Sequence, residues 1–194
     1  MGNRSTIMLQ RNEIDEIQKE SGFTPNQIVR LYSRFTSLDK SNMGALSRAD
    51  FLRIPELAIN PLGDRIVHSF FRGCPDDQVN FRQFVKILAI FRPVKRHGSH
   101  THLISDRNTK ENKLKFAFQL YDLDEDSKIS ADEILAVLQM MVGVNIPDDQ
   151  LESIAERTLQ ENDTDHDGFI SLEEFCTAME DSDVDNRLSL RFLS

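Results

Sequence analysis

The segment DTDHDGFISLEE, residues 163–174, places carboxylates at intervals that suit a calcium ion. Calcium takes oxygen ligands, and a twelve-residue loop supplies them from positions 1, 3, 5, 7 and 9 and from a bidentate acid at position 12. A glycine at position 6, here Gly168, allows the sharp turn that such a loop needs. The segment therefore predicts a calcium site whose ligands are Asp163, Asp165, Asp167, the carbonyl of Phe169, Ser171 and Glu174.

A second segment, DLDEDSKISADE at residues 122–133, repeats the pattern. Ser127 stands where glycine is usual, which costs about 1 kcal/mol of backbone strain but removes no ligand. Four carboxylates in each loop favour tight binding, so we expect two calcium ions as cofactors. The predicted ligands of the second ion are Asp122, Asp124, Asp126, the carbonyl of Lys128, Ser130 and Glu133.

Helices must hold both loops, and the apolar residues around them have helical spacing. Leu114, Phe118 and Tyr121 precede the loop at 122–133, and Leu151, Ala155 and Leu159 precede the loop at 163–174. Position 8 is Ile129 in one loop and Ile170 in the other. We predict two helix-loop-helix units that pair through a short two-stranded ribbon at position 8.

Two further loops, in the first half of the chain, keep this frame without its ligands. In DKSNMGALSRAD, residues 39–50, Met43 offers no hard oxygen at position 5, and Asp50 is shorter than the glutamate needed at position 12. In RGCPDDQVNFRQ, residues 72–83, positions 1, 3 and 12 are Arg72, Cys74 and Gln83. Neither loop is expected to hold calcium.

The apolar frame of these silent loops nevertheless survives, with Leu46 and Val79 at position 8 and with Thr24 and Pro25 as a helix start. We therefore predict an all-α chain of four helix-loop-helix units in two pairs, each pair joined by a short two-stranded β ribbon. The predicted domains are a first lobe at 1–91, a linker at 92–112, and a second lobe at 113–194 that ends in a tail.

Charge separates the same two halves. Residues 1–112 carry 17 Lys and Arg against 12 Asp and Glu, whereas residues 113–194 carry 6 against 20. The arginines of the first half are scattered among acids without interleaved aromatics, so nucleic acid is not an expected partner. Neither a catalytic constellation nor a phosphate-cradling loop is found, so the chain is not expected to be an enzyme. We expect His68 to pack within a helix.

The N-terminus, MGNRST, fits the pattern for N-myristoylation, with Gly2 as the acceptor. One myristoyl chain binds a bilayer only marginally, so a second contact is needed to hold the chain at a membrane surface. No run of residues reaches the roughly 20 apolar positions that a membrane span requires. The expected locations are the cytoplasm and the cytoplasmic face of the plasma membrane.

The second half also offers apolar side chains to a partner helix. Met140 and Met141, in LAVLQMMVGVNI at residues 135–146, are the candidates for a groove, because methionine adapts to the shape of a bound helix. The same leucine-rich stretch fits a nuclear export signal and hence nuclear shuttling. Leu188, Leu190 and Phe192 in the tail are expected either to fold back onto this groove or to fray.

Beyond these features, the chain resembles the calcineurin B homologous proteins, a family of EF-hand proteins similar to calcineurin B. The resemblance is carried by RLYSRFTSLDK, RIPELAINPLGDRI, VNFRQFVKILAIFRP, FAFQLYDLDEDSKIS, MMVGVNI and the terminal RFLS. It implies a subunit that binds an amphipathic helix in the cytoplasmic tail of a plasma-membrane sodium/proton exchanger, supports its activity, and inhibits calcineurin. Calcineurin B itself is expected to have four working loops, so Arg72, Cys74 and the segment 92–112 argue against it.

The residues leave a second function open. The chain could be a constitutive, calcium-saturated subunit of a transporter, or a calcium sensor that regulates a phosphatase in the manner of calcineurin B, or a kinase. Eight carboxylates in two paired loops favour the first alternative, because tight sites stay filled at resting calcium.

Overall fold

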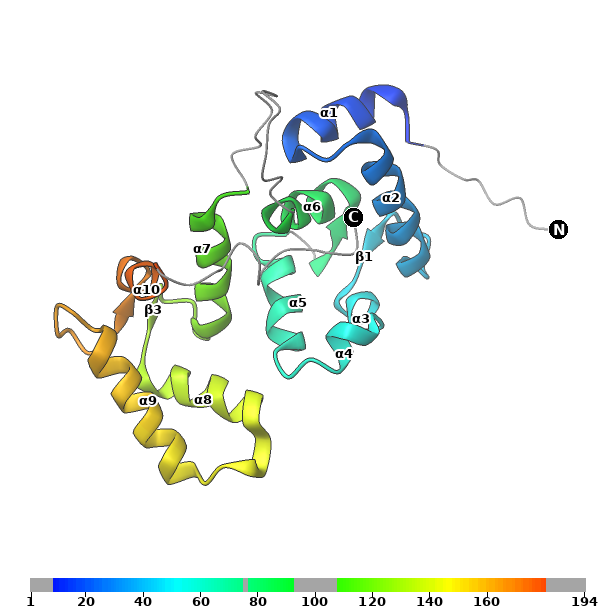
Figure 1. The fold of residues 1–194 in the computed structure, drawn as a ribbon. Coiled ribbons are helices and arrows are strands. Elements are labelled where there is room, and N and C mark those ends of the chain that lie inside the picture. Colours follow the sequence, from blue (N-terminus) through cyan, green and yellow to red (C-terminus); the bar gives the residue numbers. More distant parts are fainter. Residues whose placement is uncertain (1–8, 75–76, 93–107, 181–194) are drawn as a thin grey trace.

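The structure is a computed structural model of the 194-residue chain and describes residues 9–74, 77–92 and 108–180. The predicted Gly2 acylation site, most of the segment 92–112 and the tail at 187–194 lie outside the described residues. Helices dominate, as predicted from the sequence (Figure 1). They are α1 (Arg11–Ser21), α2 (Pro25–Leu38), α3 (Arg48–Phe51), α4 (Pro55–Ala58), α5 (Gly63–Phe71) and α6 (Phe81–Leu88), then α7 (Lys110–Tyr121), α8 (Ala131–Val142), α9 (Asp148–Asn162) and α10 (Leu172–Ala178).

Two antiparallel ribbons join the helix-loop-helix units in pairs. Strands β1 (Ala45–Leu46) and β2 (Val79–Asn80) pair with Leu46 opposite Val79, and β3 (Lys128–Ile129) and β4 (Ile170–Ser171) pair with Ile129 opposite Ile170. These are the position-8 pairings expected from the sequence. All four apolar side chains are almost fully buried, so the predicted fold class is confirmed.

Local sequence signals explain where the helices start. The Thr24 hydroxyl caps α2 by accepting from the Gln27 N–H, and the Thr24 N–H donates in return to the Gln27 side chain. Pro25 occupies the first helical position. The last residue of each acidic loop has a related role, because Glu133 and Glu174 complete capping boxes with Ser130 and Ser171. The loop geometry and the start of the next helix are therefore specified by the same residues.

Three helical features differ from the sequence prediction. Helix α1 had no predicted counterpart, although Gln10 and Glu13 form a capping box at its start. The helix leaving the first silent loop is broken into α3 and α4, because Ile54 is extended before Pro55. Helix α7 begins at Lys110, inside the predicted linker 92–112, because Thr109 caps it.

The buried apolar residues form two clusters, and α7 contributes to both. Leu114 and Phe118 pack into the second-half core, whereas Phe116 packs into the first-half core against Phe91, with 4.8 Å between ring centroids. In Figure 1, α7 lies between α5 of the first half and α10 of the second. Among the described helices, none is long and apolar enough to cross a membrane.

Helix α1 is tied to α6 by a charge cluster. Arg82 and Lys86 both pair with Glu20, and Arg82 also pairs with Glu16. The hydrogen bond from Arg82, aided by Lys86, lowers the pKa of Glu20 from 4.5 to about 2. A carboxyl with a lowered folded-state pKa stabilises the fold fully above its unfolded pKa, and this stabilisation is lost as the pH falls through the folded-state value.

We therefore expect Glu20→Gln to lower the urea midpoint of unfolding near neutral pH. The difference in midpoint between this variant and the wild-type chain should shrink as the pH falls from 4.5 toward about 2. Urea denaturation near pH 7 and at about pH 3 measures this. Glu56→Gln is the matched control, because Glu56 makes no ion pair with any residue that the structure describes. A difference that does not change with pH would contradict the account.

Candidate metal centres

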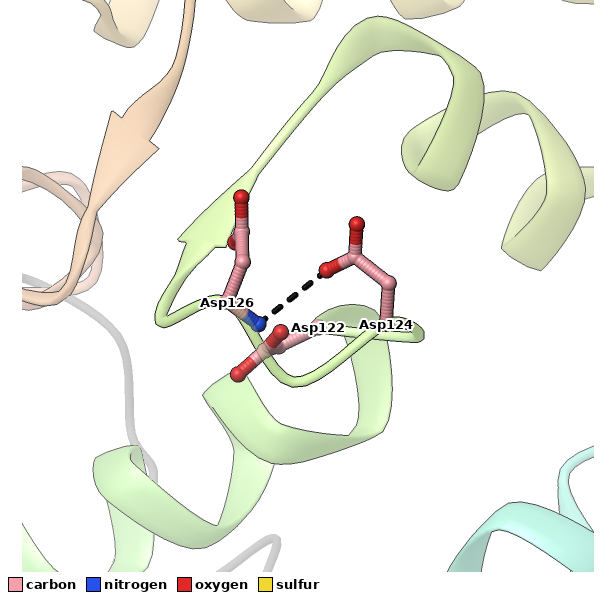
Figure 2. Close-up of side chains that lie close together, drawn as sticks. All are labelled: Asp122, Asp124 and Asp126. Carbon is pink, nitrogen blue, oxygen red and sulfur yellow. Dashed lines mark hydrogen bonds between the residues drawn. The ribbon is translucent and has the colours of Figure 1, made fainter.

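The loop at 122–133 gathers three of its predicted ligands. Asp122, Asp124 and Asp126 each contribute a carboxylate oxygen to a group within 4.8 Å of one another, and Figure 2 shows the three side chains around the loop. The backbone N–H of Asp126 donates to Asp124 at 3.1 Å, which fixes the turn between them. Asp122 is buried at the end of α7, while the other two are exposed.

The Asp122 carboxylate provides a test of whether a cation fits this loop. Its Oδ1 atom is buried and has no hydrogen-bond partner among the described residues. Burial raises the pKa of Asp122, and the nearby charges of Glu133 and Asp126 add to this, while Arg72 opposes it. An unpaired buried carboxylate oxygen is costly, and a hard dication beside it would remove that cost. The donor set therefore fits calcium.

Glu133 closes the loop from the start of α8. Its Oε2 accepts from the Ser130 backbone N–H at 2.7 Å and from the Ser130 hydroxyl at 2.8 Å, and its Oε1 accepts from the Leu123 N–H at 2.7 Å. Burial opposes ionisation, but these bonds outweigh it and lower the pKa of Glu133. The carboxylate is thus ionised and oriented across the loop, although it lies outside the three-carboxylate group.

The loop at 163–174 gathers a different subset of its predicted ligands, namely Asp163, Asp165 and Glu174. Glu174 accepts from the Ser171 N–H at 2.9 Å and from the Thr164 hydroxyl at 2.7 Å. These bonds lower the pKa of Glu174 from 4.5 to about 2. The carboxylate is therefore charged over the whole neutral range and suited to the closing, bidentate position.

Asp167 lies outside this group and accepts from two donors. The Lys128 ammonium pairs with its Oδ2 at 2.6 Å, and the Phe169 N–H donates to its Oδ1 at 2.9 Å. Lys128 also lies 4.9 Å from the centre of the Phe169 ring. The two residues predicted to ligate through their carbonyls thus contact each other across the paired loops.

Backbone conformation shows that one loop geometry is shared by acidic and silent segments. Position 4 is left-handed in three loops, at Asn42, Glu125 and His166, and position 6 is left-handed at Gly44, Ser127 and Gly168. Ser127 adopts φ +72°, the strained conformation expected where serine replaces glycine. Position 4 was not recognised from the sequence, since its residue types differ in every loop.

The silent loop at 39–50 is held by hydrogen bonds of its own. Asp39 accepts from the Ser41 hydroxyl and the Gly44 N–H, both at 2.8 Å, and more weakly from the Met43 N–H. Burial opposes ionisation, yet these bonds hold the pKa of Asp39 below its usual value. Its buried carboxylate oxygens are thus already engaged, unlike Oδ1 of Asp122.

Several contacts around the centres were missed by sequence reasoning. Thr164, at position 2 of its loop, supports Glu174, and Glu125, at position 4, is held by His68 at 2.7 Å. His68 lies in helix α5 as expected, and its ring also reaches Glu125 in the second half, a contact that the sequence did not predict. The predicted groove residues Met140 and Met141 are on α8 and are 42% and 51% exposed.

Comparison with known proteins agrees with this geometry. A family model for an EF-hand domain pair matches residues 111–180. Over 187 residues the chain is 41% identical to the calcineurin B subunit of Naegleria gruberi, covering 96% of this chain and 98% of that protein. It is 40% identical over 175 residues to the type 1 calcineurin B subunit of Dictyostelium discoideum, covering 90% and 89%. It is 38% identical over 179 residues to the calcineurin B subunit of Candida glabrata, covering 92% and 94%.

These relatives support a calcium-binding, calcineurin B-like chain, which is the broader part of the sequence prediction. They favour the calcineurin B-like alternative more than the exchanger subunit. Arg72, Cys74 and the segment 92–112, which argued against calcineurin B on sequence, do not prevent similarity over nearly the full length.

If Glu133 and Glu174 close the two loops, Glu133→Gln and Glu174→Gln should each remove one calcium ion, because the amide loses bidentate coordination. Calcium titration by calorimetry should give one strong site fewer in each variant, with at least about tenfold loss of affinity at the altered loop. Asp50→Asn, at the last position of the silent loop 39–50, is the control and should change nothing. Unchanged stoichiometry in both glutamate variants would reject these ligand sets.

Proposed function

The chain belongs to the calcineurin B family of EF-hand proteins, and from this premise we propose that it is a non-catalytic regulatory subunit. It holds calcium in its second half and binds an amphipathic helix of a larger protein. One observation carries this proposal. The two loops that hold the carboxylate groups are paired through β3 and β4, and the helix that follows the first of these loops carries exposed methionines.

Helices α8 and α9 supply the surface for the partner helix. Met140 and Met141 are near the end of α8, and Ile154 on the neighbouring α9 is 44% exposed. Flexible thioether side chains adapt to different apolar anchors, which a bound helix presents at spacings of three and four residues. Apolar side chains that are exposed to water cost free energy, so a partner that covers them gains binding free energy from their burial.

The first candidate partner is the catalytic subunit of calcineurin. Its support is the near full-length similarity to three calcineurin B subunits. In this case the chain takes the place of calcineurin B, and its calcium ions stabilise the lobe that contacts the catalytic chain.

The second candidate partner is the amphipathic helix in the tail of a sodium/proton exchanger. It is favoured by the silent first half, where Met43 stands at a ligand position, because two silent loops followed by two working ones resemble the calcineurin B homologous proteins. With this partner the chain supports the exchanger and also inhibits calcineurin. A myristoyl group on Gly2 would add a weak membrane contact, placing the chain at the cytoplasmic face of the plasma membrane as well as in the cytoplasm.

Binding of two synthetic helices by the calcium-loaded full-length chain tests the proposal. One peptide carries the helix of a calcineurin catalytic chain that binds calcineurin B, and the other carries the tail helix of a sodium/proton exchanger. We expect Met141→Asp to weaken the binding of the peptide by at least tenfold, or about 1.4 kcal/mol, because a carboxylate would be buried against the apolar anchors of the peptide.

The matched control is Ile59→Asp, since Ile59 follows α4 in the first half and is 82% exposed. Calorimetry distinguishes the candidates by which peptide binds more tightly. The proposal fails if neither peptide binds in calcium, or if Ile59→Asp weakens binding as much as Met141→Asp does.

A separate prediction concerns the N-terminus. Gly2→Ala should abolish acylation while changing the affinity for the partner helix by less than about threefold, because the lipid and the helix use separate contacts. Mass spectrometry of the chain co-expressed with N-myristoyltransferase measures the modification. An unmodified wild-type chain would overturn it.

A further inference from the structure

One face of α5 carries three cationic or imidazole side chains that all reach the loop at 122–133. Arg65, His68 and, directly after the helix, Arg72 are spaced by three and four residues, so they lie in one row. We call this row the α5 row. It belongs to the silent half of the chain, yet each of its members contacts the second half.

Arg65 anchors the row to the end of α7. Its Nη2 donates to the carbonyls of Gln119 at 3.0 Å and Asp122 at 2.8 Å, and its Nε donates to that of Leu120 at 3.4 Å. The last carbonyls of a helix have no partner within the helix and carry partial negative charge. The guanidinium therefore satisfies them and fixes the entry to the loop.

His68 fixes position 4 of the loop. Its Nδ1 faces the Arg48 guanidinium at 3.3 Å, and its Nε2 is 2.7 Å from Oε1 of Glu125. Because arginine can only donate, Nδ1 accepts and Nε2–H donates to the carboxylate. Glu125, whose backbone is left-handed at φ +64°, is thus held by the first half of the chain.

Arg72 brings a positive charge to the predicted calcium ligand itself. Its Nε is 3.5 Å from Oε2 of Glu125, and its Nη2 is 3.9 Å from Oδ2 of Asp122. The Asp122 side chain is only 2% exposed, so this interaction is less screened than a surface pair. Glu125 thus gives the Arg72 guanidinium a second carboxylate partner beside Asp122.

We propose that Arg72 is an affinity-setting residue: its anchored charge weakens calcium binding at loop 122–133 and so makes this site weaker than the one at 163–174. The inference rests on calcium binding by loop 122–133, which is part of the proposed function. The positive charge of Arg72 competes with calcium for Asp122, the first ligand of the loop. Arg65 and His68 hold the loop in place beside that charge.

The loop at 163–174 differs in how its neighbouring cation is held. Lys128 pairs with Asp167, but its side chain is 43% exposed and ends in a flexible ammonium. It can turn into solvent at small cost when the metal binds. Arg72 is held by Glu125 as well as by Asp122, so its repulsion of the metal persists.

Calcium titration of the full-length chain in a Glu174→Gln background tests this, because that background leaves loop 122–133 as the titrated site. We expect Arg72→Gln to tighten calcium binding by roughly tenfold at low salt, and the gain to shrink at high salt. Arg72→Lys keeps the charge but ends in a flexible ammonium, so it should tighten binding less than Arg72→Gln does. Arg82→Gln, which removes an arginine paired on the far α1–α6 side, should have no effect.

Equal or weaker calcium binding in Arg72→Gln than in its parent would overturn the inference alone. If the Glu174→Gln chain bound no calcium, the metal assignment would fail and the inference would fall with it. Binding of the partner peptides is measured separately, so failure of the partner proposal is distinguishable from both. Thermal unfolding in chelator verifies that each variant is folded.

Discussion

The pairing of two loops through one buried apolar residue from each is the contact on which the rest of the structure depends. Ile129 opposite Ile170 in one half, and Leu46 opposite Val79 in the other, are almost completely buried. Each such side chain contributes about 1.5 to 3 kcal/mol through burial. The pairing places the two loops of each half next to each other and so positions the helices that enter and leave them. Since it needs no metal, it operates equally in the acidic and the silent half.

That independence from metal explains how the first half keeps its geometry. In loop 39–50 the Asp39 carboxylate is satisfied by donors within the loop, so the left-handed turns at Asn42 and Gly44 persist. In loop 122–133 the corresponding Asp122 keeps an oxygen without a partner among the described residues. Asp163 of the acidic loop 163–174 accepts comparable bonds from the N–H groups of Asp167 and Gly168. The residues at the ligand positions, rather than these bonds, therefore separate the acidic loops from the silent one. The silent half has a further role, because α5 and Phe116 of α7 connect it to the second half.

The sequence was sufficient for the features that repeat at fixed spacing. The four loop frames, the position-8 pairs and the acidic residues could be found because loop chemistry fixes residue type at each position. Contacts between distant segments could not be found in this way. Arg65 bonds to carbonyls 54 to 57 residues away, and those carbonyls have no sequence signature. From the sequence, Arg72 was recognised only as a residue that cannot bind calcium at position 1 of its loop. In the structure it forms ion pairs with Asp122 and Glu125. Helix α1 was missed because Gln10 is a weaker capping signal than serine or threonine.

The central claim is that calcium belongs to the second half alone, while the first half reproduces the same loop geometry without metal. Native mass spectrometry of the full-length wild-type chain, titrated with calcium to saturation, tests this most directly. The account predicts that the population stops at two bound calcium ions. A third specifically bound ion, or saturation at one or none, would contradict it.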